Sequence, residues 1–286
     1  VPEEHNARIT ITPVWQTNGE HKDSEMFITT SEVTNEGDPS CGDSNTTLGS
    51  SMIFLSPQFG IEPYHISLNR EGPHRFKGKE NRCDMSNWLI ATQVYQTGDE
   101  ITEDVNLEIN VFYTPIPDEE QAKEWDEREI SSPGDPDEVP EIENPQAITG
   151  GTGFNDAVEI SEGSYSDKIV PGEYRMYKIP VKWGERPVIK AKTPKSVVND
   201  VDSISFGFHN PLRGQAGRGT LSVFDEGEEA GPVSPSSYAW QASKSQRQGY
   251  YFVWFGMGTK GGDEITGVEQ PYEFAVALDG EPADGG

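Results

Sequence analysis

The stretch Gly42-Asp43-Ser44 contains a serine that could act as a catalytic nucleophile. Such a serine needs an apolar strand before it and a histidine partner after it. Here the polar stretch Asp38-Pro39-Ser40-Cys41 comes before it, and the later histidine, His209, follows Phe208 without an Asp-x-x pattern. Gly-x-Ser-x-Gly and His-Glu-x-x-His are absent, and no two histidines have the spacing of zinc ligands on a helix. The sequence therefore predicts no catalytic centre.

Acidic loops offer a second chemistry, the binding of a hard cation through oxygen ligands. Extracellular β-sandwiches often fix such loops with Ca²⁺, and none of the acidic loops here follows the twelve-residue EF-hand pattern. The candidate ligands are Asn155, Asp156, Asp200 and Asp202, together with Asp225, Glu226 and Glu228. Because a loop acid is more often simply solvated, a structural Ca²⁺ is an alternative, and we expect no other cofactor.

Aromatic side chains offer a third chemistry, stacking on a sugar ring or anchoring a protein partner. The candidate ligand-binding residues are Tyr238, Trp240, Tyr251 and Trp254, and aromatic residues continue through the stretch 250–255. Alternate residues of a strand point to opposite faces, so half of that stretch must be core. Packing is therefore the favoured interpretation for most of the cluster.

Five basic residues form a concentration in an otherwise acidic chain: Lys182, Arg186, Lys190, Lys192 and Lys195. They could meet an acidic polymer, such as a teichoic or uronic chain. They could also pair with the chain's own acidic segment at 118–143. Pairing within the chain is the simpler explanation.

The charge balance excludes some partners. The chain has 49 acidic and 22 basic residues, which give a net charge of −27 at pH 7. Nucleic acid and anionic membrane surfaces would be repelled by this charge. No window approaches the ~18 apolar residues of a membrane-spanning helix, so we expect no membrane contact by these residues. We expect a mature or excised ectodomain, which a helix after residue 286 could anchor.

Two cysteines, Cys41 and Cys83, lie in polar surroundings rich in Gly, Asn and Asp. Free structural cysteines are usually buried among apolar residues, so a disulfide is the main interpretation. In the chain-entropy model, closing a loop of this length stabilises the fold by about 4 kcal/mol. A disulfide predicts an oxidising location, either extracellular or on the outer face of the cell envelope. Two unrelated thiols are the alternative.

Strand-like alternation governs most of the chain. Ile, Val, Thr and aromatic residues alternate with polar ones in stretches bounded by Gly, Pro, Asn and Asp, which is typical of β-strands. These stretches are 8–15, 26–30, 51–55, 89–95 and 105–113, followed by others between 154 and 278. The acidic segment at 118–143 differs, because one short helix is plausible at its start and prolines break the remainder. It has the composition of a solvated linker.

The pentapeptide Gly-Asp-Glu-Ile-Thr occurs at 98–102 and again at 262–266. Each copy follows an aromatic-rich stretch and precedes an alternating one, which indicates one structural unit used twice. We therefore predict an all-β chain of two antiparallel, jelly-roll-like β-sandwiches joined by an acidic linker with at most a short helix. The predicted domains are 6–116, with the disulfide, and 148–280, with a linker at 117–147 and a disordered tail at 281–286.

The opening of the second predicted domain carries a set of turn motifs. Its elements are Phe154-Asn-Asp-Ala157, Gly163-Ser-Tyr165-Ser-Asp167, Pro171-Gly-Glu173, Tyr177 and Trp183-Gly184. This stretch resembles the bacterial pre-peptidase C-terminal-like domain, as it occurs in secreted or membrane-anchored actinobacterial proteins. The resemblance implies a small jelly-roll-like sandwich outside the cell, usually a non-catalytic accessory module. The first predicted domain lacks this opening.

These observations favour a non-catalytic extracellular or cell-envelope protein that binds a glycan or another protein. A secreted hydrolase acting on cell-wall polymers, or its accessory domain, is the first alternative. It would require two carboxylates about 5–10 Å apart in a groove lined by Trp or Tyr. A purely structural stalk is the second alternative.

Overall fold

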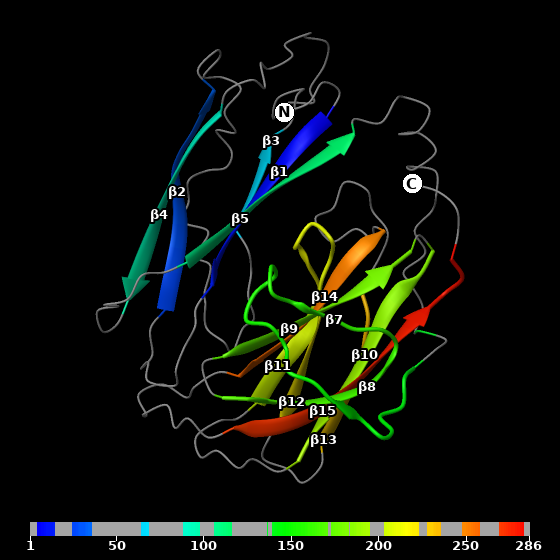
Figure 1. The fold of residues 1–286 in the computed structure, drawn as a ribbon. Coiled ribbons are helices and arrows are strands. Elements are labelled where there is room, and N and C mark those ends of the chain that lie inside the picture. The colour runs from blue at the N-terminus through cyan, green and yellow to red at the C-terminus, as the bar shows by residue number, and fades with distance from the viewer. Residues whose placement is uncertain are drawn as a thin grey trace. The chain divides into compact units, whose positions relative to one another are not determined.

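The structure is a computed structural model and describes the following residues: 5–14, 25–35, 64–68, 88–97, 106–115, 136, 139–170, 173–182, 184–194, 203–222, 228–235, 248–257 and 269–282. All regular secondary structure within these ranges is β-strand, so the expected all-β class is confirmed (Figure 1). Contacts between Cα atoms divide the chain into two compact units: 1–13, 25–54 and 63–128 form the first, and 14–24, 55–62 and 129–286 form the second. Within the described ranges, no helix is long and apolar enough to cross a membrane.

The second unit contains strands β6 to β15. Their bounds are β6 Gln146–Ala147, β7 Val158–Glu159, β8 Gly163–Ile169, β9 Tyr174–Val181, β10 Arg186–Thr193, β11 Ser203–His209, β12 Gln215–Ser222, β13 Glu228–Val233, β14 Gly249–Met257 and β15 Gln270–Asp279. The eight long strands pair antiparallel in a nested order: β8 with β15, β9 with β14, β10 with β13 and β11 with β12. This nesting of first with last strand is the jelly-roll topology.

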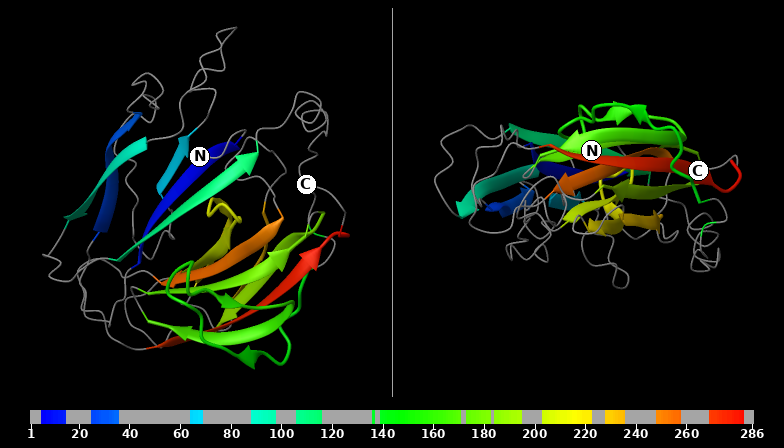
Figure 2. Two further views of the ribbon diagram at one scale, coloured as in Figure 1. Left: turned by 45° about the horizontal axis from the view of Figure 1, so that its top comes forward. Right: turned by 90° about the horizontal axis from the view of Figure 1, so that it is seen from below.

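Two five-stranded sheets result, with orders β13-β10-β15-β8-β6 and β12-β11-β14-β9-β7. We call them the β8 sheet and the β9 sheet, and Figure 2 gives two further views of their layers. Inward-facing side chains of both sheets form one core, in which Phe255 stacks on Phe206 with ring centroids 5.7 Å apart and on Tyr272 at 4.3 Å. Aromatic packing of this kind supplies much of the apolar area that a β-sandwich buries.

The opposite face of the β9 sheet is also buried. Phe252 and Trp254 point away from the core residues of β14, and Trp254 has 0% exposure. Phe154, from the loop before β7, meets the rings of Phe252 and His209 edge-on at 4.9 and 5.2 Å. Strand β14 is therefore covered on both sides, which explains its nearly continuous apolar sequence.

The first unit contains a three-stranded sheet, β3-β1-β5, and a two-stranded sheet, β2-β4. The bounds are β1 His5–Val14, β2 Glu25–Asn35, β3 Tyr64–Leu68, β4 Trp88–Thr97 and β5 Asn106–Pro115. Strands at the positions of β1, β2, β4 and β5 were expected, whereas β3 was not. The expected strand at 51–55 and the short helix at 117–128 lie outside the described residues.

Both copies of the repeated pentapeptide lie outside the described residues, but the strands around them can be compared. In the second unit, β14 before the repeat belongs to one sheet and β15 after it to the other. In the first unit, β4 and β5 are likewise in different sheets. Moreover, β2 pairs with β4 as β9 pairs with β14, and β1 pairs with β5 as β8 pairs with β15. The pairing thus agrees with one structural unit used twice.

The end of the segment expected as a linker differs from the expectation. Gln146 and Ala147 form β6, which pairs parallel with Tyr165 and Ser166 of β8. The amide of Ile148 continues this contact by donating to the carbonyl of Ser166 at 3.0 Å. Residues 139–149, which we call the strap, therefore belong to the second unit, because their backbone groups find partners on β8.

Candidate functional site

A buried carboxylate lies between the two sheets of the second unit. The alternation of β8 turns Tyr165, Asp167 and Ile169 inward, and Asp167 is only 8% exposed. Its Oδ2 atom accepts hydrogen bonds from the Tyr177 hydroxyl at 2.6 Å and from the Gly150 amide at 2.8 Å. Its Oδ1 atom accepts from the amide of Lys168 at 2.8 Å. A buried charge persists only with such partners, so Asp167 is held as a hydrogen-bonded carboxylate.

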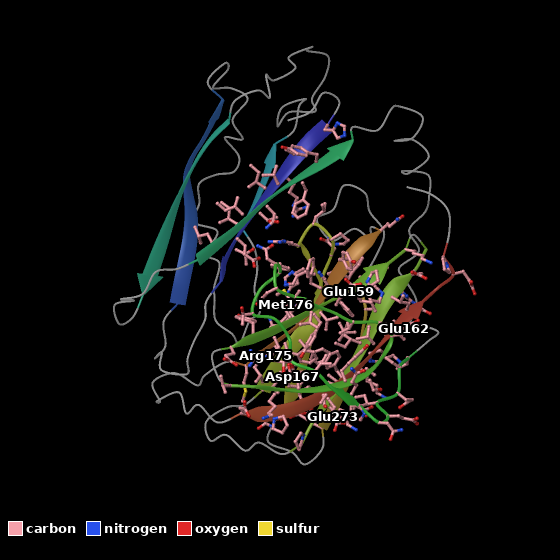
Figure 3. The ribbon with its side chains drawn as sticks, in the orientation of Figure 1. Glu159, Glu162, Asp167, Arg175, Met176 and Glu273 are labelled. Carbon is pink, nitrogen blue, oxygen red and sulfur yellow. The ribbon has the colours of Figure 1, made fainter. Side chains whose placement is uncertain are left out.

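Two tyrosines and an arginine surround this carboxylate. The hydroxyls of Tyr177 and Tyr272 lie 2.8 Å apart, and Arg175 Nε is 3.9 Å from Asp167 Oδ2. Arg175 also pairs with Glu173 at 2.9 Å (Figure 3, where Arg175 and Asp167 are labelled). Burial raises the pKa of both tyrosines far above the usual value, and the charge of Asp167 acts in the same direction. Both hydroxyls therefore remain protonated and act as donors and acceptors.

A pocket of about 890 Å³ opens beside this cluster. The strap forms one wall, and the ends of β8, β10 and β15 form the others. Its lining residues are Ala147, Ile148, Thr149, Ser166, Asp167, Lys168, Lys192, Thr193, Pro194, Pro271, Tyr272 and Glu273. The volume falls within the range of small-molecule sites, and the lining mixes charged groups and hydroxyls with prolines.

The strap is fixed at both ends. At its start, the Ser164 hydroxyl donates to the Glu141 carbonyl and accepts from the Glu143 amide, each at 3.1 Å. Directly after its end, the Gly150 amide donates to Asp167. A side chain at Gly150 would place a Cβ atom 2.8 Å from the Tyr177 ring, so this close approach requires glycine. The pocket wall is thus attached to the Asp167 cluster.

The expected basic concentration is largely paired with acidic side chains. Lys192 Nζ lies 2.8 Å from Glu273, and Arg186 Nε lies 2.6 Å from Asp279. Lys190 pairs with Glu229 at 2.5 Å and with Glu141 at 3.5 Å. Because Glu141 belongs to the acidic segment, one of these pairs is the contact within the chain that was expected. Lys195 lies outside the described residues.

Two of the four aromatic residues that were expected to bind a ligand are buried, so the expectation is wrong for them. Tyr251 points into the core and Trp254 to the covered face of the β9 sheet, and both have 0% exposure. Neither ring can stack on a ligand, because strand β14 is packed on both sides. Tyr238 and Trp240 lie outside the described residues. Tyr250, at the start of β14, is 41% exposed, and its hydroxyl donates to Glu159 at 3.0 Å.

The expected calcium ligands Asn155 and Asp156 have protein partners. Asp156 accepts from the Thr152 amide and hydroxyl and from the Gly153 amide, at 2.7 to 3.0 Å, and so closes its own loop. Asn155 Oδ1 accepts from Arg213 at 2.9 Å. Among described residues, no group of three or more His, Cys, Asp and Glu side chains could hold a metal ion. Asp200, Asp202, Asp225 and Glu226 lie outside the described residues, as do Cys41 and Cys83. Glu228 begins β13.

Sequence reasoning did not single out the pocket or the role of Asp167. One signal was present, because the strict alternation of β8 places an aspartate on the same face as Tyr165 and Ile169. A charged residue on the core face of a strand predicts a buried hydrogen-bonding partner. The pocket itself had no local signal, since its walls come from four separate parts of the chain.

Comparisons with known proteins give only distant likenesses. No family model matches the chain, and no curated protein matches it. Among solved structures, it is similar to an arabinose-bound GH51 α-L-arabinofuranosidase, with 10% identity, a TM-score of 0.26 and coverage of 41% of this chain and 19% of that one. It is also similar to a VP2 subviral particle of infectious bursal disease virus, with 8% identity, a TM-score of 0.27 and coverage of 96% and 56%.

A third solved structure is the tandem CBM22 domain of Xyn10C from Paenibacillus barcinonensis. Here the identity is 9%, the TM-score is 0.25, and the match covers 99% of this chain and 80% of that one. The chain spans 19% of the arabinofuranosidase and 56% of the viral protein. Likenesses this distant carry no argument about family or function.

Proposed function

We propose that the protein is a non-catalytic binding protein of the cell exterior, and that the second unit holds a glycan in the pocket beside the strap. The observation that carries the proposal is the pocket of about 890 Å³ with its mixed lining. Sugar hydroxyls both donate and accept hydrogen bonds, so they suit a surface where ammonium, carboxylate and hydroxyl groups alternate. Pro194 and Pro271 add apolar surface against which the C–H groups of a sugar ring can lie.

Two features support binding rather than hydrolysis. Glycoside hydrolysis uses two carboxylates, one as an acid and the other as a nucleophile or base. In the pocket, Asp167 already accepts three short hydrogen bonds, and Glu273 is paired with Lys192 at 2.8 Å. Carboxylates engaged in this way hold the fold and the pocket shape. If the wild type hydrolysed a glycan and the Glu273→Gln variant did not, the proposal would be contradicted.

The resemblance to pre-peptidase C-terminal-like domains remains a proposal, supported by the roles of its motif residues. Phe154 packs on the β9 sheet, Tyr165 donates to the Ser161 carbonyl at 2.8 Å, and Asp167 and Tyr177 form the bond between the sheets. These are structural roles, as a fold-determining motif requires. Extracellular location is proposed together with a Cys41–Cys83 disulfide, which mass spectrometry of the unreduced protein would test.

A pocket-filling substitution tests glycan binding. Thr149 is an exposed wall residue, and Thr149→Trp would place a large ring in the pocket. The matched control is Thr220→Trp, an exposed position on β12 in the other sheet. We expect the wild type and the control to bind a glycan from an array with equal affinity, confirmed by calorimetry, and Thr149→Trp to lose binding. Equal binding by all three proteins would place the ligand elsewhere.

A protein partner is the second candidate, and one observation favours it. On β5, the apolar side chains of Ile109, Val111 and Tyr113 are 60%, 47% and 51% exposed. An exposed apolar row on one strand is a common feature of protein-binding surfaces. If a purified envelope protein binds the chain, Val111→Lys should abolish that binding, whereas Thr149→Trp should leave it unchanged.

A further inference from the structure

The charges that line the pocket balance one another, although the chain as a whole carries a net charge of −27. The lining includes two lysines, Lys168 and Lys192, and two carboxylates, Asp167 and Glu273. An acidic protein would ordinarily repel anions, and a basic pocket in it would attract them. This pocket has equal numbers of lysines and carboxylates in its lining, so its effect on an anion depends on how each lysine is paired.

The pair of Lys192 and Glu273 is set by the strand register. The two residues are direct partners in the antiparallel pairing of β10 and β15, and Nζ lies 2.8 Å from Oε2. Facing positions of opposite charge stabilise such a pair. Both side chains are about one-third exposed, at 38% and 34%, and the paired Oε2 atom of Glu273 is itself buried, so a ligand in the pocket can reach their exposed atoms without separating the pair. Glu273 is labelled in Figure 3.

Lys168, on the other side of β15, is neutralised as well. Its Nζ lies 2.6 Å from Glu269, which immediately precedes β15. The hydrogen bond to Glu269 is the main cause of the raised pKa of Lys168, so the ammonium group stays charged and paired. The buried Asp167 has its own donors in Tyr177, Gly150 and Lys168. The pocket therefore presents paired lysine side chains.

We infer that the pocket selects an uncharged, polyhydroxylated glycan over a uronic or phosphate-bearing one. This inference rests on the proposed function and names the ligand class of that same pocket. A neutral sugar can hydrogen-bond to both members of each ion pair and leave the pair intact. A polyanion must compete with Glu269 and Glu273 for their lysines while it enters the field of an acidic protein. Pairing, and not the number of lysines, decides the preference.

The test breaks the pair of Lys192 and Glu273 from either side. Glu273→Gln removes the carboxylate that neutralises Lys192 and keeps the size of the side chain. Lys192→Gln has the opposite effect and leaves Glu273 without its partner. Glu229→Gln is the matched control, because Glu229 pairs with Lys190, which does not line the pocket. Thermal unfolding of all variants checks the fold, and changes in exposed pairs should shift the unfolding temperature little.

The probes are neutral hexasaccharides (gluco-, manno- and xylo-) and hexagalacturonate, measured by calorimetry at low and high salt. We expect the wild type to prefer a neutral hexasaccharide at least tenfold. In Glu273→Gln this preference should shrink about fivefold, because the ammonium group of Lys192 near the water-exposed surface is then free to attract an anion. The gained binding of hexagalacturonate should weaken at high salt. Lys192→Gln should widen the preference, and Glu229→Gln should match the wild type.

The two possible failures can be distinguished. Wild-type preference for hexagalacturonate would contradict the inference and leave the proposed glycan binding in place. An unchanged preference in Glu273→Gln would contradict it too, because the charge pairs would then not set the selectivity. Binding of neither class of hexasaccharide by the wild type would contradict the proposed function itself, and the inference with it.

Discussion

The Tyr177 hydroxyl donates a 2.6 Å hydrogen bond to the Asp167 carboxylate inside the second unit. The two residues belong to different sheets, since Asp167 is on β8 and Tyr177 on β9. The bond therefore joins the two layers of the sandwich through a buried charge. Charged hydrogen bonds of this kind contribute more than neutral ones, so this pair should be important for stability.

Removing this hydroxyl should weaken the fold. Tyr177→Phe keeps the ring packing on Phe274, whose centroid is 5.0 Å away, but deprives Asp167 of its closest donor. We expect the free energy of unfolding to fall by about 1–3 kcal/mol in urea denaturation. Tyr250→Phe is the control, because it removes an exposed hydroxyl and should change stability far less. Equal losses in both variants would show that the buried bond has no special role.

The close approach of Gly150 to Tyr177 gives a second prediction. A Cβ atom on residue 150 would lie 2.8 Å from Cζ and 3.0 Å from the hydroxyl oxygen of Tyr177. Gly150→Ala should therefore displace the ring and cost about 1–3 kcal/mol of unfolding free energy. Because both changes disturb one hydrogen bond, Gly150→Ala and Tyr177→Phe should be non-additive by at least about 0.5 kcal/mol in a double-mutant cycle. Strict additivity would contradict a shared cause.

The strand content of the second unit could be predicted from sequence because local alternation reports it. Tyr165, Asp167 and Ile169 alternate with polar residues in β8, and the outward residues are partly or fully exposed. The same rule was incomplete for β14. It assigns Tyr251 to one face and Trp254 to the other, but cannot tell that both faces are covered. Coverage depends on the loop carrying Phe154, about a hundred residues away.

Pairing between distant strands could not be predicted from local pattern. β8 meets β15 across about a hundred residues, and this pairing places Ser166 opposite Glu273 and Lys168 opposite Pro271. The pocket exists only once that register is set. Likewise, the sequence alone presents the basic residues near Lys192 as a possible site for an anion. Only the register with β15 shows that Glu273 neutralises the charge of Lys192.

Acid should destabilise the second unit through His209. This histidine is fully buried, and burial is the main cause that lowers its pKa to about 3. An unfolded chain binds a proton near its ordinary pKa of about 6.5, so below that pH the unfolded state holds more protons. Stability should therefore fall with pH between about 6.5 and 3, by up to about 1.4 kcal/mol per pH unit from this group.

The variant His209→Leu isolates this contribution from that of the many carboxylates. Arg213, the cation near His209, is retained in the variant, so the difference between the two proteins reports the histidine. Urea denaturation at several pH values should give a shallower acid loss for the variant. Parallel pH profiles would show that His209 titrates normally in the folded protein.

Burial should decide which ion pair matters for stability. Arg186 and Asp279 are register partners at 2.6 Å with side chains 12% and 8% exposed, whereas Lys168 and Glu269 lie equally close but are more than half exposed. Asp279→Asn removes the negative charge that lies 2.6 Å from the largely buried Arg186 guanidinium and should cost about 3 kcal/mol. Glu269→Gln should cost much less, because water screens this exposed pair. Thermal denaturation in low and high salt would separate them, because salt screens exposed pairs most. A larger loss for Glu269→Gln would mean that burial does not govern these pairs.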